Sequence, residues 1–477
     1  MDAQAPIAPP DILPVFSHAQ IVRVLTGILL CILLSAIDQT VVVPAVPAIA
    51  ADLNGFGHLA WIVTAYLLTS TASTPIYGKL SDIYGRRALL LPAIVLFVIA
   101  SALCALSQNL MQLILFRALQ GLGGGGLMAM AQASIADVVA PRERGRYQGY
   151  MAGTWAVAAI SGPILGGWIT DHLSWHFIFW INLPVGAAAY VLSSRALKLL
   201  PPRRARGLRI DYLGAALLTA LITTCLLVMS WGGVAYAWLS WQVLGTTALA
   251  VALLAALSVQ ERMAPDPLLP PRLFGNRAVI CGIAIAFLTS GATLGGTFLL
   301  PLFYQLVRGS DASSSGALLV PFLLLSTAGA YAAGQSTKRF GRTKPVVFIG
   351  LAIACAGFLL LGLMPQSTAS SLVALYTGGI GIGLGLCGPT SMIIVQNAAE
   401  RRDIGAATGA LLFLRSMGGA FGSTMVGALL MLRPGESPDA RLAGSIQTGF
   451  LLCAGMIGLA FVACASMREL PLRSNAK

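Results

Sequence analysis

The sequence predicts an all-α protein that crosses a membrane many times. Of its 477 residues, 57% are hydrophobic and only 10% are charged, whereas ordinary soluble domains carry about 25% charged residues. The mean hydropathy is +0.82, so a soluble fold of this size would lack the polar surface needed to cover it. The hydrophobic runs are long and continuous, unlike the alternating segments of roughly 10 residues in outer-membrane barrels. The composition therefore excludes a soluble enzyme and a disordered chain.

Fourteen hydrophobic runs have the length of about 20 residues that a membrane-spanning helix needs. They lie at 24–48, 60–79, 88–107, 110–136, 147–170, 177–198, 212–231, 241–259, 278–305, 315–336, 345–364, 370–397, 405–431 and 443–466. An even number of spans places both ends of the chain on the same side of the membrane.

The distribution of basic residues indicates which side that is. Nearly all of the 30 Lys and Arg residues fall in one alternating set of connections between the runs. The opposite set holds Arg308, Arg433 and Arg441. Because short cytoplasmic loops are enriched in Lys and Arg, we expect both termini in the cytoplasm. The same rule accounts for the net charge of +13 without a nucleic-acid partner.

An internal repeat divides the chain into two related halves. Gly78 and Gly334 are 256 residues apart, and so are Gly85-Arg86 and Gly341-Arg342. The same offset relates six further pairs of glycines, Gly123/Gly379, Gly125/Gly381, Gly149/Gly405, Gly153/Gly409, Gly162/Gly418 and Gly166/Gly422. Internal repeats of this kind are common in transporters.

The repeat predicts two pseudo-symmetric six-helix bundles with two further helices inserted between them. We expect a cytoplasmic tail at 1–23, the first bundle at 24–200, a linker with the inserted helices at 201–275, the second bundle at 276–467 and a tail at 468–477. Two parallel halves imply a central cavity and a rocking motion, which is typical of a transporter. A channel would instead need a repeated pore-lining filter.

Three charged residues lie deep within the predicted spans: Asp38, Arg117 and Arg415. A charge at the bilayer centre costs about 2.5–3.5 kcal/mol, so each should face a cavity or a partner. Burial opposes the charge on Asp38 and a nearby arginine favours it, so this carboxyl could bind and release a proton. The alternative is a permanent Asp38–Arg117 ion pair that braces two helices. Arg415 could neutralise an anionic ligand group, bind a carbonyl or lock helices together.

Five motifs then point to a known family. They are Ile37–Pro47 in the first span, Gly78–Arg87 after the second, Arg117–Gly121 in the fourth, Gly162–Gly167 in the fifth and Trp175–Gly186 at the start of the sixth. With them the chain resembles the major facilitator superfamily, and within it the fourteen-helix drug:H+ antiporter branch of QacA- and EmrB-like multidrug exporters. The resemblance runs from about Ala36 to about Met467.

The resemblance implies roles for the residues of these motifs. Asp38 and Arg117 would take part in proton coupling. The loop motif would close the cytoplasmic gate in the outward-open state through Gly78, Asp82, Gly85, Arg86 and Arg87, with Asp82 bonding to a helix end or an arginine of the other half. One departure concerns Lys338, which occupies the position of Asp82 in the second half. A deep acid is also missing from 315–336, which argues against dicationic substrates.

The fifth-span motif contains Gly162, Pro163, Gly166 and Gly167. Proline interrupts the helical hydrogen bonds, and glycines allow a neighbouring helix to approach closely. The resemblance implies a bendable contact that controls leakage, and the alternative is static packing.

The resemblance also places several residues on spans that line the substrate cavity. Aromatic rings there would suit flat hydrophobic ligands, and ring faces attract cations. Packing inside a bundle or contact with lipid is the alternative for each aromatic. The expected cavity residues are Gln39, Gln120, Trp155, Phe298, Tyr304, Phe413 and Arg415.

The sequence as a whole predicts a proton-coupled exporter of hydrophobic, cationic or neutral drugs in a bacterial inner membrane. The proton motive force would drive it, with no cofactor and no metal, and we expect a monomer in the lipid bilayer whose need for a periplasmic adaptor stays open. An alternative is an exporter of acidic compounds that uses Arg117 and Arg415. A membrane-embedded enzyme is a remote alternative, because HExxH, GxSxG and P-loop motifs are absent and the four histidines are scattered.

Overall fold

The computed structural model describes residues 18–53, 59–139, 141–199, 211–232, 236–304, 320–365, 368–431, 438–467 and 469. Within these ranges the chain is helical, with one isolated bridge between Gly232 and Tyr236. Residues 1–17 of the predicted tail 1–23, residues 468 and 470–477 of the predicted tail 468–477, and residues 201–210 at the start of the predicted linker lie outside the described residues, as do Arg308 and Arg433.

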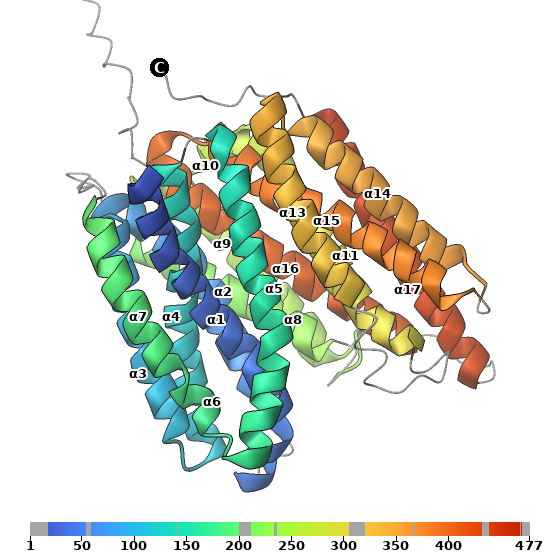
Figure 1. Ribbon diagram of the computed structural model, residues 1–477, viewed down its shortest axis with the longest axis horizontal. Helices are drawn as coiled ribbons and strands as arrows, with labels where there is room; N and C mark the ends of the chain where they lie inside the picture. The colour runs from blue at the N-terminus through green and yellow to red at the C-terminus, as the bar shows by residue number, and fades with distance from the viewer. Residues whose placement is uncertain are drawn as a thin grey trace, which may run out of the picture.

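The helices form two halves with an insertion between them (Figure 1). The first half holds α1 (His18–Asp52), α2 (Leu59–Tyr84), α3 (Arg86–Ala105), α4 (Leu110–Val138), α5 (Pro141–His172), α6 (Phe177–Trp180) and α7 (Asn182–Ala196). The insertion holds α8 (Tyr212–Trp231), α9 (Trp241–Met263) and the short α10 (Pro271–Gly275). The second half holds α11 (Arg277–Leu302), α13 (Val320–Phe340), α14 (Lys344–Leu363), α15 (Ser370–Ala398), α16 (Ile404–Met431) and α17 (Pro438–Ser466).

Twelve stretches of helix in the described residues are long and apolar enough to cross a membrane. They include α6 and α7 as one stretch, Phe177–Ala196, and leave out α2 and α13. These two helices are 26 and 21 residues long but carry several Ser and Thr residues. The protein is therefore a multi-pass membrane protein, and the total of fourteen spans stays a prediction.

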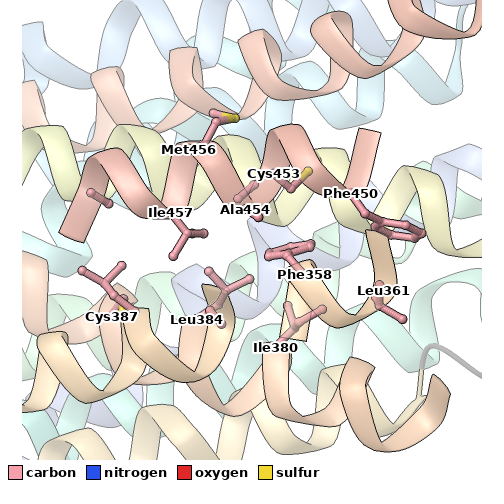
Figure 2. Packing of buried hydrophobic residues seen from close by; sticks show 14 of the residues in the cluster. Phe358, Leu361, Ile380, Leu384, Cys387, Phe450, Cys453, Ala454, Met456 and Ile457 are labelled. Atoms are coloured by element: carbon pink, nitrogen blue, oxygen red, sulfur yellow. The ribbon is translucent and has the colours of Figure 1, made fainter. Parts of the chain in front are cut away.

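Each half has its own hydrophobic core. In the first half, Leu34, Phe97 and Phe179 are completely buried between helices. In the second half, Phe358 of α14 packs among Ile380 and Leu384 of α15 and residues of α17 such as Phe450 (Figure 2). Most of the buried apolar side chains of each half therefore pack within that half.

The two halves use the same set of helix contacts. In the first half α2 packs on α4, α3 on α4 and α1 on α5, and in the second half α13 packs on α15, α14 on α15 and α11 on α16. The loops after α2 and α13 each contain a glycine with positive φ, 86° at Gly85 and 66° at Gly341. These two glycines are the residues that the sequence repeat aligns.

The inserted helices pack against both halves. Helix α8 contacts α9, α2 and α16. Ala72 of α2 and Phe413 of α16 share one buried cluster with Leu218, Ile222 and other residues of α8 and α9. The Thr424 hydroxyl of α16 also donates to the Met229 carbonyl of α8 at 3.0 Å. The insertion therefore covers the line where the two halves meet along α2 and α16.

The halves touch closely at one end of the molecule, which carries Arg23, Arg86, Arg87, Lys338 and Lys344. We call it the basic end. There, a β-carbon added to Gly78 of α2 would lie 2.5 Å from the Gly405 carbonyl oxygen of α16. Likewise, a β-carbon on Gly334 of α13 would overlap the backbone of Gly145 in α5. The ribbons of the two halves diverge toward the opposite end (Figure 1).

The left-handed backbone at Gly341 should make this residue intolerant of a side chain. A β-carbon at Gly341 would meet no atom within 4 Å, so only the positive φ opposes it. We expect Gly341→Ala to lower the free energy of unfolding by about 1–2 kcal/mol. The control is Gly458→Ala in α17, which is also uncrowded but helical, and which should leave stability unchanged or raise it. Thermal unfolding in detergent measures both, and equal effects would contradict the backbone argument.

Candidate functional site

A buried ion pair lies inside the first half. The Asp38 side chain of α1 is 0% exposed and that of Arg117 in α4 is 1% exposed, with 2.6 Å between Arg117 Nη1 and Asp38 Oδ2. The other carboxylate oxygen, Oδ1, accepts hydrogen bonds from Gln120 Nε2 and Asn182 Nδ2, both at 2.8 Å. Asp38 therefore accepts three hydrogen bonds, an environment that suits the ionised carboxylate. We call Asp38, Arg117, Gln120 and Asn182 the Asp38 cluster.

Arg117 has further partners that do not depend on Asp38. Its Nε donates to the Ile62 carbonyl at 3.1 Å, and Nη1 also donates to Gln120 Oε1 at 2.7 Å. The guanidinium carbon lies 4.5 Å from the centre of the Tyr66 ring, a distance that allows a cation–π contact. Arg117 would thus keep three favourable contacts if Asp38 became neutral.

The sequence predicts only part of this cluster. It pairs Asp38 with Arg117, but the resemblance places Gln120 in the substrate cavity, whereas Gln120 is fully buried and bonds to both charged side chains. Asn182 lies in the motif Trp175–Gly186 and has no predicted role. The sequence signal for Asn182 is its position as a lone amide at the start of a hydrophobic helix. In the structure, Asn182 Nδ2 also donates to Ser101 Oγ of α3 at 3.0 Å.

Asp82 joins the two halves at the basic end. Its carboxylate accepts hydrogen bonds from the backbone N–H groups of Gly405 and Ala406 in the first turn of α16, at 3.2 and 3.0 Å. A helix N-terminus presents free N–H groups and a positive dipole, so an anion is stabilised there. Arg86 lies 2.9 Å from Asp82 and 2.8 Å from Asp137, so its one positive charge is shared between the two carboxylates.

Of the other predicted gate residues, one contacts the second half, one forms a turn and one is exposed on the surface. Gly78 lies against Gly405, and Gly85 forms the turn with positive φ, while Arg87 is exposed. On the repeat-related side, Lys338 of α13 lies 3.6 Å from Glu143 in the first turn of α5, and both side chains are about half exposed. The second contact therefore carries reversed charges and is weaker than the first, because exposed ion pairs contribute little.

The glycines of the fifth-span motif are not equivalent. A β-carbon on Gly162 would overlap the Thr40 side chain, and one on Gly166 would overlap the Val41 carbonyl, so both glycines bring α5 close to α1. Thr40 Oγ1 donates across the same contact to the Ala158 carbonyl at 3.0 Å. Pro163 lies within the helix and is exposed, and a β-carbon on Gly167 would meet nothing within 4 Å.

The predicted cavity residues occupy several environments. Phe298 is 48% exposed, and Gln39 and Trp155 are half-buried. Tyr304 and Phe413 differ from the expectation, since they are 2% and 8% exposed. Tyr304 packs in the core of the second half, and Phe413 packs against the inserted helices. Their aromatic character reflects packing between helices, which the sequence could not distinguish from a ligand contact.

Comparison with known proteins identifies the family. A family model described as the Major Facilitator Superfamily matches residues 28–423. The chain belongs to the Major Facilitator Superfamily. Proteins of this superfamily are transporters and not enzymes, so the enzyme alternative is discarded, and they need no cofactor.

Relatives within the superfamily include efflux proteins. The Bacillus subtilis multidrug transporter protein MdtP is 37% identical over 413 residues, which cover 86% of this chain and 76% of that protein. An MFS-type transporter of Mycobacterium tuberculosis, Rv1877, is 36% identical over 438 residues, which cover 91% of this chain and 63% of that protein. The crystal structure of the human organic anion transporter MFSD10 matches 93% of this chain and 99% of that chain with a TM-score of 0.68. At 18% identity, this last match establishes the fold alone.

The two glycines that end the fifth-span motif form a matched pair of test sites. Gly166→Ala should force α5 away from α1 and lower the free energy of unfolding by about 1–3 kcal/mol, as overpacking does. Gly167→Ala adds the same methyl group in open space and should behave like the parent protein. Thermal unfolding in detergent and efflux of a hydrophobic dye from cells compare the two variants. A similar loss in both would show that contact with Val41 is not the reason for the glycine.

The Asp82 contact should hold the basic end closed. Asp82→Asn removes the charge that faces α16 and Arg86, and we expect the closed state to lose about 3 kcal/mol, as for a broken buried ion pair. Hydrogen–deuterium exchange of the first turn of α16, from Ile404, should then become faster. Glu143→Gln is the control, because that ion pair is half exposed and should contribute less than about 1 kcal/mol. Unchanged exchange in the Asp82 variant would refute a closing role.

Proposed function

We propose that this protein is a proton-driven exporter that moves hydrophobic small molecules by alternating access. Membership of the superfamily and its multidrug relatives support export. The observation that carries the proton coupling is the Asp38 cluster, a carboxylate that is fully buried in the first half and paired with Arg117. Ionisable residues inside a membrane commonly belong to proton or substrate pathways.

The proton would bind Asp38 and cancel its negative charge. The ion pair with Arg117 would then end, and the guanidinium would remain on the Ile62 carbonyl, Gln120 Oε1 and the Tyr66 ring. Removing one charge of a buried ion pair costs several kcal/mol when the other charge is left without partners. The remaining contacts of Arg117 would lower the free energy of the state in which Asp38 is protonated. A free-energy change of several kcal/mol at the contact between α1 and α4 is enough to shift the equilibrium between the inward- and outward-facing conformations.

The basic end would face the cytoplasm. The rule that basic residues collect in cytoplasmic loops supports this orientation, as it does cytoplasmic termini. In the conformation described here, the Gly78–Gly405 and Gly145–Gly334 contacts and the Asp82 bonds close the basic end. The conformation would therefore be the outward-facing one. A bacterial inner membrane is supported by the bacterial relatives.

Asp38 offers a poor binding site for a cationic substrate in this conformation. Both carboxylate oxygens already accept hydrogen bonds from Arg117, Gln120 and Asn182, and the side chain is fully buried. A cation would have to replace the Arg117 guanidinium to reach it. The proposal therefore assigns Asp38 to the proton and leaves recognition of the substrate to other residues.

Proton coupling can be tested with Asp38→Asn. Everted membrane vesicles with an imposed pH gradient, monitored with a pH-sensitive dye, should show release of protons when a transported compound is added. We expect Asp38→Asn to reduce this release at least about tenfold while the protein still binds the compound. The control is Asp52→Asn at the end of α1, whose carboxylate accepts one hydrogen bond from Trp175 Nε1 that an amide oxygen can also accept. Undiminished coupled flux in the Asp38 variant would refute the proposal.

A further inference from the structure

Arg415 of α16 points into the space between the two halves. On one side of α16, Gly418 and Gly422 lie against α11, and on another side Gly405 and Gly409 lie against α2. At 100° per residue, Arg415 lies between these two packed sides. It is 11 residues after the start of α16 at Ile404, hence about 16 Å from the basic end along the helix. Arg415 is thus near the middle of the membrane.

The guanidinium reaches toward α15. Its Nη2 atom would lie 4.0 Å from a β-carbon on Gly388, at a point where this helix carries no side chain. The Arg415 side chain is exposed, and its side of α16 is opposite the side on which Thr424 bonds to the inserted helix α8. Within the described residues, no carboxylate or hydrogen-bond acceptor binds Arg415.

The other deep charges do not compensate Arg415. Asp38 and Arg117 neutralise each other inside the first half, and both are buried. In the described part of the chain, Arg415 is therefore the one unpaired charge near mid-membrane. An unpaired positive charge in a site of low dielectric attracts an anion and repels a cation strongly.

Apolar side chains lie beside Arg415 on the side away from the basic end. Leu294 of α11 lies against Gly419, one turn after Arg415 on α16. Leu294 and Phe298, one turn further along α11, are 47% and 48% exposed. A charged head at Arg415 and a hydrophobic body along α11 and α16 would together match an amphipathic acid.

We infer that Arg415 binds the anionic group of the exported compound, so that the substrate class is hydrophobic acids carrying a carboxylate or sulfonate. This inference rests on the proposed export function and adds the charge of its substrate. The guanidinium would donate two parallel hydrogen bonds to such a group, a geometry that arginine provides and lysine does not. A lipid phosphate has the same chemistry and is the competing ligand.

The test uses three probes that share one pyrene body: 1-pyrenebutyrate, 1-pyrenebutanol and 1-pyrenebutylamine. Equilibrium dialysis of the full-length protein in detergent, without a pH gradient, gives the affinity for each. We expect the acid to bind about tenfold more tightly than the alcohol, as for a hydrogen bond to a charged group, and the amine to bind least. Arg415→Gln should remove the preference for the acid and leave the affinity for the alcohol within about twofold. Arg415→Lys should retain part of the preference.

Each other result overturns the inference. An equal loss for acid and alcohol in Arg415→Gln would mean that Arg415 only supports the structure. An unchanged preference for the acid would place anion binding elsewhere. Displacement of pyrenebutyrate by dihexanoyl phosphatidylglycerol, with no proton release on adding pyrenebutyrate to vesicles, would assign the site to lipid. Binding is measured without a gradient, so a failure of proton coupling leaves the charge preference testable by itself.

Discussion

The Asp38–Arg117 ion pair constrains the whole first half. Two opposite charges buried among apolar helices must stay together, because separating them without new partners costs several kcal/mol. The pair joins α1 to α4, and Asn182 at the start of α7 completes its hydrogen bonds. Any movement of these helices against each other is therefore linked to the charge on Asp38. This link is what makes the pair suitable for coupling to protons.

The ion pair also makes the two halves electrically different. The first half is neutral at mid-membrane, whereas the second half keeps the charge of Arg415 without compensation among the described residues. The contacts at the basic end are also unequal, since Asp82 caps α16 directly and is buried, whereas the Lys338–Glu143 pair is half exposed. Under the proposed function, the repeated fold would divide two chemical tasks, with proton binding in one half and substrate recognition in the other.

Close backbone contact explains how the halves can move apart and return. At Gly78–Gly405 and Gly145–Gly334 the helices touch without interlocking side chains, so closing requires little repacking. The insertion adds a further connection at this end, because Arg272 of α10 binds Asp403 through two hydrogen bonds of 2.8 and 2.9 Å just before α16. The N-terminus of α16 is therefore held from α2 and from α10 at once.

The sequence by itself determined the membrane class, the helical segments and the two-fold repeat, since these depend on composition, length and the spacing of glycines. It also identified Asp38 and Arg117, because a charge within an apolar run is conspicuous. Only the tertiary structure decided which way each helix is turned. It buried Tyr304 and Phe413, placed Gln120 in the Asp38 cluster and left Phe298 exposed. In a membrane the lipid-facing and packed sides of a helix are both apolar, so hydropathy carries no stripe that would show which side faces inward.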